Sequence, residues 1–299
     1  MLTSLQKLTL NSNQLYGTFP SAIGTALSRI ETIQISENQL SGQLPDELGG
    51  LENLSVILFF SNLFTGSIPP KLAKASRMRI FNLSNNKLNG TIPEFQTHGT
   101  AKEVYLSNNL LTGTVPLSLT KLNQLAELHL EKNNLSGVSI VGSGSGLPKF
   151  PSISNISTVP SFSLFLFLQT LHGGFGDQGE LSVLSVFQNS FSGSIPTQLG
   201  GGEGQDLKRL LLHHNEFEGS LPTQLGRLHK LEWLALNHNQ LAGTVPEEVL
   251  RGESLKILDL QSNDLEGTLP ESLASMTNLG ALCQVATLSD TNSYVFGAP

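Results

Sequence analysis

Cysteine is nearly absent from this sequence: Cys283 stands alone among 299 residues. A lone cysteine cannot form an intrachain disulfide bond, so cysteine usage gives no support for an oxidising compartment. Charge is scarce as well, because Asp, Glu, Lys and Arg make up only 14% of the residues and the formal net charge is −7. Nucleic-acid-binding proteins usually carry a basic excess, so we expect no nucleic-acid partner.

Long apolar runs and catalytic motifs are also lacking. No stretch reaches the roughly 18 apolar residues of a transmembrane helix, and FSLFLFLQTL at 162–171 is too short. The opening MLTSLQKLTL has neither the basic start nor the apolar run of a signal peptide. The motifs G-x-x-x-x-G-K-[ST], H-E-x-x-H, C-x-x-C and G-x-S-x-G are missing. We therefore expect no enzyme, no cofactor, no metal and no membrane span in this chain.

What the sequence does contain is a repeat. The frame L-x-x-L-x-L-x-x-N-x-L-x-G-x-[IVLF]-P occurs ten times, mostly at steps of 24 residues, and an eleventh copy begins at Leu279 and fails. One step, from Asn133 to Asn189, is far longer than the others. The asparagines of the frame are Asn13, Asn38, Asn62, Asn86, Asn109, Asn133, Asn189, Asn215, Asn239 and Asn263.

One copy, LEWLALNHNQLAGTVP at 231–246, indicates the local structure. Alternation places Leu234 and Leu236 on one face of a short strand and Trp233 on the other. Gly243 and Pro246 then favour a turn. One coil cannot bury its own leucines, whereas stacked coils can, so the chain should return to the same place once per repeat.

The repeated asparagine has a physical reason. Where each strand ends, backbone N–H and C=O groups lose their ladder partners, and an unpaired buried group costs about 1–3 kcal/mol. An Asn amide both donates and accepts, so it can satisfy backbone groups in its own coil and in the next. The sequence therefore predicts a ladder of asparagines inside the stack.

The frame resembles the leucine-rich-repeat family, and specifically its plant-type subclass. The marks of that subclass are the 24-residue period and the L-x-G-x-I-P segment, as in LNGTIP at 88–93 and FSGSIP at 191–196. The resemblance implies an α/β-type, right-handed solenoid with a concave parallel sheet and a convex side of 3₁₀ turns and loops. It also implies a non-enzymatic protein that binds a protein, peptide or glycan, as receptor-like ectodomains and polygalacturonase inhibitors do.

The chain departs from that family at its ends and in the middle. Cysteine-paired caps are missing, so we expect a part of a longer product. The expected organisation is repeats 1–6 at 1–137, an irregular insert at 138–180, repeats 7–10 with the incomplete eleventh at 181–282, and an irregular tail at 283–299. The insert could be a loop island, a degenerate repeat with a loop, or non-native sequence.

With the frame fixed, the variable strand positions are the candidate binding surface. The late repeats supply a basic and aromatic set in which Trp233 could anchor a ligand and Arg209 could hold a carboxylate. His214 and His238 share one offset, so they should lie on adjacent strands; a solvated face without function is the alternative. The candidate ligand-binding residues are Lys208, Arg209, His213, His214, Trp233, Asn237, His238, Lys256 and Asp259, with Phe60, Tyr105, His129 and Phe187 as secondary candidates.

Five sequons, N-x-[ST], could carry glycans: Asn53, Asn82, Asn89, Asn134 and Asn155. A glycan on Asn82 would block the central strand surface and favour binding at the late repeats.

The resemblance implies the signalling ectodomain of a cell-surface receptor-like glycoprotein, outside the cell, with a protein, peptide or glycan ligand and a co-receptor as a further candidate partner. A soluble inhibitor or an intracellular, cytoplasmic scaffold is the second interpretation. An enzyme that uses His213, His214 and His238 is a remote third.

Overall fold

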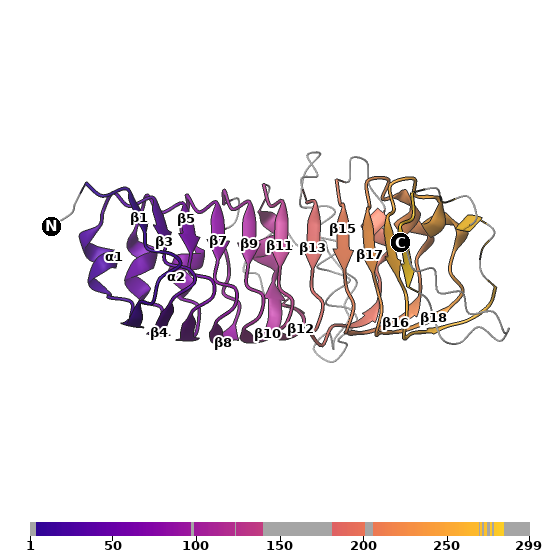
Figure 1. Cartoon of the computed structure of the whole chain (residues 1–299), viewed down its shortest axis with the longest axis horizontal. Coiled ribbons are helices and arrows are strands. Elements are labelled where there is room, and N and C mark those ends of the chain that lie inside the picture. The colour runs from indigo at the N-terminus through magenta and orange to yellow at the C-terminus, as the bar shows by residue number, and fades with distance from the viewer. Residues whose placement is uncertain are drawn as a thin grey trace, which may run out of the picture. The chain divides into compact units, whose positions relative to one another are not determined.

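The computed structural model describes residues 4–283 apart from 97–98, 123, 140–180, 201–205, 269, 271, 274–275 and 277. The chain divides into two compact units, Met1–Leu135 and Ser136–Pro299. Each unit is a stack of short parallel strands joined by turns and short helices (Figure 1). The predicted insert lies outside the described residues except at 138–139, and the tail does so except at Cys283.

The first sheet of the first unit repeats one strand per coil. Neighbouring strands pair in parallel with no slip, as at Val56↔Ile80 and Leu58↔Asn82. The middle residue of a strand points into the core, since Ile57 and Phe81 are fully buried while their flanking residues are half-exposed. The strands are β1 (Lys7–Thr9), β3 (Thr32–Gln34), β5 (Val56–Leu58), β7 (Ile80–Asn82), β9 (Glu103–Tyr105) and β11 (Glu127–His129).

A second parallel sheet follows the turn after each of these strands. Its glycines, such as Gly66 at φ 75° and Gly90 at φ 74°, adopt the left-handed backbone that side chains disfavour, which explains the glycine of the frame. Its strands are β2 (Tyr16–Thr18), β4 (Gln39–Gln43), β6 (Leu63–Gly66), β8 (Lys87–Thr91), β10 (Leu110–Pro116) and β12 (Asn134–Ser139).

Short helices complete four coils of the first unit, whereas the described residues between β8 and β9 form none. Proline lacks a backbone donor and fixes φ, so it ends the second strand and precedes the helical turn, as Pro45 does before η1. Glycine lets successive turns approach, because a Cβ on Gly49 would lie 2.4 Å from Lys71 Cβ. The helices are α1 (Ala22–Ala26), η1 (Asp46–Gly50), α2 (Pro70–Ala73) and η2 (Leu117–Lys121), where η marks a 3₁₀ helix.

The second unit repeats the same plan. Its first sheet contains β13 (Val183–Ser185), β15 (Arg209–Leu211), β17 (Trp233–Ala235), β19 (Ile257–Asp259) and β21 (Ala281–Cys283). Its second sheet contains β14 (Ser192–Ser194), β16 (Glu216–Ser220), β18 (Gln240–Gly243) and β20 (Asp264–Leu265), and its helices are η4 (Thr197–Gly200), η5 (Thr223–Arg227) and η6 (Glu247–Arg251). The incomplete eleventh repeat still provides a strand, because β21 pairs with β19 in register.

The asparagine ladder is confirmed, but the expected direction was wrong, because the bonds between coils run to the preceding coil and not to the next one. The side-chain oxygen of Asn86 accepts a bond from the Phe64 backbone N–H at 3.0 Å. Its amide nitrogen donates to the Phe59 carbonyl at 3.0 Å and to the Leu83 carbonyl at 3.1 Å. The cross-coil pattern recurs at Asn38, Asn62, Asn109, Asn133, Asn215, Asn239 and Asn263.

The expected fold class is therefore confirmed as an α/β-type solenoid with few helices. Each unit buries the leucine positions of its frame between two parallel sheets and a row of short helical turns. The outward side of the first sheet and the turns that follow it lie outside this core, as do exposed residues of the second sheet and of the helical turns.

Candidate functional site

Most of the candidate residues lie on the outward side of the first sheet of the second unit. We call it the strand face. The residues of the strand face stand six, four and two positions before the frame asparagine of their coil. The residues five and three positions before it face the core. The three rows are Val183, Arg209, Trp233 and Ile257; Ser185, Leu211, Ala235 and Asp259; and Phe187, His213, Asn237 and Gln261.

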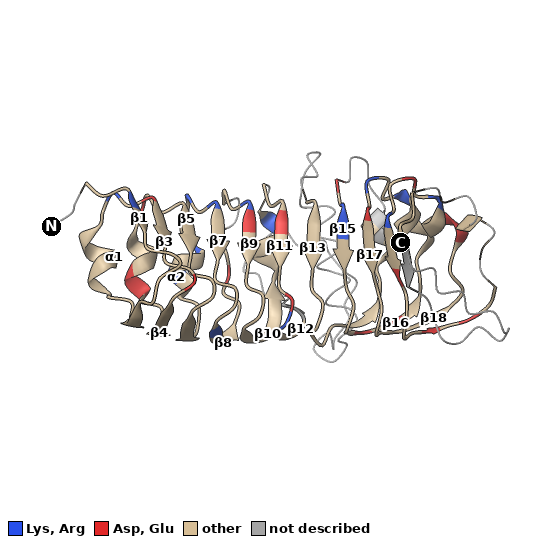
Figure 2. Cartoon of the chain, in the orientation of Figure 1, with Lys and Arg blue, Asp and Glu red and all other residues tan. Residues whose placement is uncertain are grey.

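Arg209 and Trp233 are direct neighbours on this face. Their Cα atoms pair in the register of β15 and β17, and Lys208 immediately precedes β15. Lys208 and Arg209 are exposed, and among the described residues neither side chain forms a hydrogen bond or an ion pair. Figure 2 shows the basic colour on β15. We call Lys208, Arg209 and Trp233 the basic–aromatic patch.

Lys256 differs from these two cations because it has a partner. Its Nζ donates to a carboxylate oxygen of Glu232 at 2.8 Å. That hydrogen bond and the Lys256 charge lower the pKa of Glu232, and the charges of Lys208 and Arg209 act in the same direction. Lys256 is thus engaged within the protein, whereas Lys208 and Arg209 present unpaired positive charge.

The other edge of the strand face carries four aromatic rings, Phe187, His213, His214 and His238, which we call the ring ladder. Phe187 and His213 stack with centroids 4.1 Å apart and an interplanar angle of 13°. His214 and His238 stack with the same distance and angle. His213 meets His214 edge-on at 5.6 Å.

The histidines of the second stack do not lie on strands, as the sequence suggested, but in the turns after them. His214 has φ 52° and His238 φ 53°, a left-handed conformation that recurs at this offset in every described coil. Their backbone N–H groups bond to the next coil, at the carbonyls of Asn237 and Gln261, both at 2.9 Å. The coil register therefore fixes the distance between the two rings.

Two further candidates on the strand face, Asn237 and Asp259, are less accessible. Asn237 is only 6% exposed, so its side chain offers a ligand little surface. Asp259 is half-buried and accepts bonds from the Gln261 backbone N–H at 3.3 Å and from Gln261 Nε2 at 3.5 Å. Burial raises the pKa of the Asp259 carboxyl, while these bonds and the nearby His238 and His214 oppose that rise.

The first unit gathers a different set on its own sheet: Glu103, Tyr105, Glu127, His129 and Glu131, which we call the tyrosine–glutamate cluster. The Tyr105 hydroxyl donates to Glu127 at 2.6 Å and lies 3.2 Å from Glu103 Oε2. The Tyr105 and His129 rings stack at 4.9 Å, and His129 Nδ1 lies 3.3 Å from Glu131. Figure 2 shows the acidic colour on β9 and β11.

His129 is the basic partner of this cluster, since its Nε2 lies 3.6 Å from Glu127 and its Nδ1 3.3 Å from Glu131. The ion pairs of the described residues include none between its three glutamates and a lysine or arginine. One carboxylate oxygen of Glu131 is buried without a hydrogen-bond partner among the described residues. Burial and the two neighbouring glutamates raise the pKa of Tyr105 far above its usual range. Sequence reasoning missed Glu103 and Glu127, although they share one frame offset with Arg209 and Trp233.

The remaining candidates are scattered over the first unit. Phe60 is half-exposed just after β5. Among the sequons, Asn89 and Asn134 are exposed on β8 and β12, while Asn82 accepts two hydrogen bonds from Ser84. Asn53 donates to the Ser28 carbonyl and accepts from Arg77. Asn155 lies outside the described residues.

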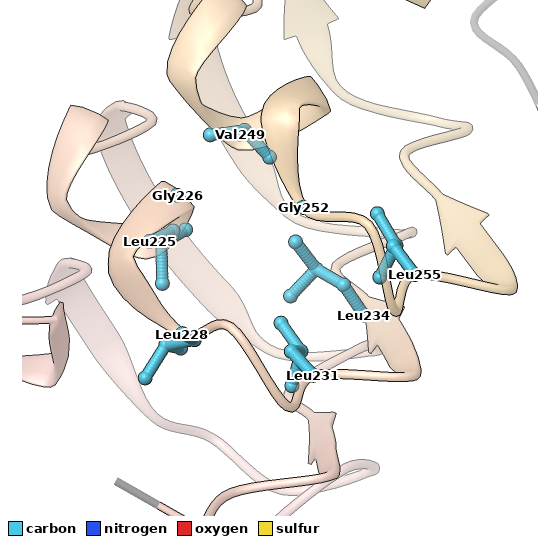
Figure 3. A pocket seen from close by; sticks show the side chains of 8 residues that line it. All are labelled: Leu225, Gly226, Leu228, Leu231, Leu234, Val249, Gly252 and Leu255. Atoms are coloured by element: carbon cyan, nitrogen blue, oxygen red, sulfur yellow. The ribbon is translucent and has the colours of Figure 1, made fainter. Parts of the chain in front are cut away.

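In the part of the chain that the structure describes, neither clustered metal ligands nor the space between η5 and η6 offers an alternative site. Within the described ranges, no group of three or more His, Cys, Asp or Glu side chains could hold a metal ion. An apolar space between η5 and η6 has room for about 10 Å³ (Figure 3). A buried water needs at least that volume and polar partners as well. The lining is Leu225, Gly226, Leu228, Leu231, Leu234, Val249, Gly252 and Leu255, so this is a packing gap.

Comparison with known proteins agrees with the architecture. The family model described as leucine-rich repeat matches residues 4–26, 29–51, 77–97, 101–122, 206–228 and 254–276. No curated protein sequence matches the chain.

Similar solved structures include a plant peptide hormone receptor, RGFR1 in complex with RGF2, at 31% identity and TM-score 0.79, covering 96% of this chain and 40% of that one. A TDR receptor has 31% identity and TM-score 0.76, covering 93% and 42%. The Arabidopsis receptor kinase HAESA, in complex with the peptide hormone IDA and the co-receptor SERK1, has 27% identity and TM-score 0.69, covering 96% and 46%.

The chain spans less than half the length of each of these receptors. In the part of the chain that the structure describes, every helix is too short or too polar to cross a membrane. The frame, the two stacked parallel sheets, the family model and the solved relatives all agree. The chain is a leucine-rich-repeat protein of the plant type, and its repeats resemble those of plant receptor ectodomains.

Proposed function

We propose that this chain is a non-enzymatic recognition module that binds an acidic segment of a peptide or protein on the strand face of the second unit. The observation that carries the proposal is the basic–aromatic patch. Lys208 and Arg209 are exposed and form no ion pair with another described residue, and Arg209 stands in register beside Trp233. In a chain with a net charge of −7, unpaired cations next to the only tryptophan are a distinctive local feature.

The chemistry of the patch suits such a ligand. A guanidinium can hold a carboxylate through two parallel hydrogen bonds, and a lysine adds a second positive charge. Tryptophan offers a large apolar surface at little conformational cost and is enriched among residues that dominate binding energy. The ring ladder extends this surface along the opposite edge of the same strands.

The solved relatives support the ligand class. RGFR1 is a plant peptide hormone receptor whose structure was solved in complex with RGF2. HAESA was solved in complex with a peptide hormone and a co-receptor. By analogy, we infer that this chain belongs to the extracellular ligand-binding part of a cell-surface receptor-like glycoprotein and that a co-receptor joins the complex. A soluble inhibitor or an intracellular scaffold is the alternative, and a transmembrane helix encoded after residue 299 in the transcript would favour the receptor.

The direct test is peptide selection on the whole chain. Short random peptides displayed on phage should be panned against wild-type protein, and the enriched sequences synthesised and titrated by calorimetry. We expect enrichment in Asp and Glu, and a loss of affinity of about tenfold or more in Arg209→Ala, which corresponds to the 1.4 kcal/mol of one lost charged contact.

Arg227→Ala is the matched control, because Arg227 is exposed on η5 away from the strand face. It removes the same charge and should bind normally. Equal loss in both variants would show non-specific attraction and contradict the proposal. Binding of oligouronate glycans by wild type, with no peptide enriched, would replace the peptide ligand with a glycan.

A further inference from the structure

The His214–His238 stack is an unusual arrangement for two ionisable groups. The rings are nearly parallel and 4.1 Å apart, both residues are exposed, and their left-handed turns are locked to the next coil by backbone hydrogen bonds. Neutral imidazoles can stack at this distance without electrostatic cost. Two protonated rings would place like charges about 4 Å apart, which disfavours the second proton.

The groups that face the pair act in opposing directions. Burial and the His238 charge lower the pKa of His214, whereas the Asp259 carboxylate raises it. His213 meets His214 edge-on and stacks on Phe187. Asp259 is the acidic group that acts on the pair, and it is already held by two bonds from Gln261. A ligand anion next to the pair would therefore be attracted more strongly when both rings are protonated than when they are neutral.

We propose that His214 and His238 form a proton-controlled contact for an anionic group of the ligand. In their neutral forms the two rings present an uncharged aromatic surface. As the pH falls, the pair takes up protons, and a ligand carboxylate bound against the rings relieves their mutual repulsion. This inference rests on the proposed function, because it assigns a regulatory role to the same strand face.

Linkage sets the sign of the effect. A ligand anion favours the protonated rings, so binding takes up protons and affinity rises as pH falls through the histidine range. Both members are required, since a single exposed histidine would titrate once and would lack the repulsion that the ligand relieves. A proton on one ring therefore disfavours a proton on the other.

The pair itself can be tested without any ligand by following the imidazole signals of the whole chain by NMR. In wild type, we expect coupled titration of His214 and His238. In His238→Gln, the His214 titration should become a single step and move to higher pH, because the His238 charge that lowers the pKa of His214 is gone. His229→Gln, at an exposed histidine after η5, should leave the pair unchanged. Independent titration of His214 in wild type and in His238→Gln would overturn the inference.

The ligand half is tested by titrating a fluorescein-labelled polyglutamate peptide between about pH 7.5 and about pH 5.5, where glutamate stays ionised. Wild type and His229→Gln should bind more tightly at the acidic end, by several-fold. The double variant His214→Gln, His238→Gln should lose this acid enhancement. If the affinity of the double variant rose with falling pH as much as that of wild type, only the histidine inference would be overturned. No binding by any form at any pH would overturn the proposed function and the inference together.

Discussion

The hydroxyl of Tyr105 on β9 donates a hydrogen bond of 2.6 Å to Glu127 on the adjacent strand β11. Burial together with Glu127 and Glu103 raises the pKa of Tyr105, because a tyrosinate here would lie against two carboxylates. We expect Tyr105 to stay protonated at about pH 11, above the ordinary tyrosine pKa. Ultraviolet absorbance should show the same tyrosinate signal in wild type and in Tyr105→Phe.

Circular dichroism at the same pH is the control that the protein remains folded. A wild-type signal larger than that of Tyr105→Phe by one tyrosine would mean that the hydroxyl ionises freely. The tyrosine–glutamate cluster would then not have the geometry described.

Asn86→Leu tests the ladder. The substitution removes the acceptor for the Phe64 N–H and the donor for the Phe59 carbonyl, and leucine satisfies neither group. We expect the free energy of unfolding to fall by about 2–4 kcal/mol, measured by chemical denaturation. Asn89→Leu makes the same chemical change at an exposed position of β8 and should have little effect. Equal stability of the two variants would contradict the ladder.

Much of this frame could be predicted from the sequence, because each feature depends on one repeat and its immediate neighbour. The alternation in LEWLAL places Leu234 and Leu236 in the core, and the recurring asparagine predicts cross-coil bonds. The order in which Gly and Pro follow the strand predicts the turn and the helix beyond it. These features can be predicted without knowing the exact register in which the coils stack.

Glycines on the helical side should show a sharp positional contrast. A Cβ on Gly49 would lie 2.5 Å from the Lys71 carbonyl carbon, whereas a Cβ on its neighbour Gly50 meets open space. We expect Gly49→Ala to cost about 1–3 kcal/mol, because backbone of the next coil must move. Gly50→Ala should be neutral or stabilising by up to about 1 kcal/mol. Denaturation midpoints measure both, and similar midpoints would show that the coils are not packed closely here.

The pH dependence of stability carries a second signature of the histidine pair. Because the pKa of His214 is lower in the folded protein than in the unfolded chain, the unfolded state takes up the proton first. Folded-state stability should therefore fall as the pH drops below about 6.5, and it should fall less in His214→Gln. Asp259 acts in the opposite sense at lower pH, since its carboxyl pKa is raised on folding. Thermal melts at several pH values test this, and identical slopes for both proteins would contradict it.

The side-chain contacts of the candidate site could not be predicted from the repeat alone. Tyr105 and Glu127 are 22 residues apart because they occupy different positions of the frame and meet diagonally, while His214 and His238 occupy the same position and are 24 apart. The repeat alone does not say which of these two kinds of pair forms. The pairing of Lys256 with Glu232 and the burial of Asn237 depend on neighbouring side chains rather than on the frame. Aligning all copies on the asparagine would have placed Glu103 and Glu127 among the candidates, because offsets are conserved even where spacing is not.

The central claim is that the basic–aromatic patch binds ligand, and Trp233 tests it most directly. Trp233 is half-buried beside Arg209, and its side chain takes no part in the asparagine ladder. Trp233→Ala should therefore leave the fold intact. The measurement is the calorimetric affinity of the acidic peptides enriched on wild-type protein, with circular dichroism as the check on folding. We predict that affinity falls by about tenfold or more in folded Trp233→Ala. Unchanged affinity in that variant would contradict the account.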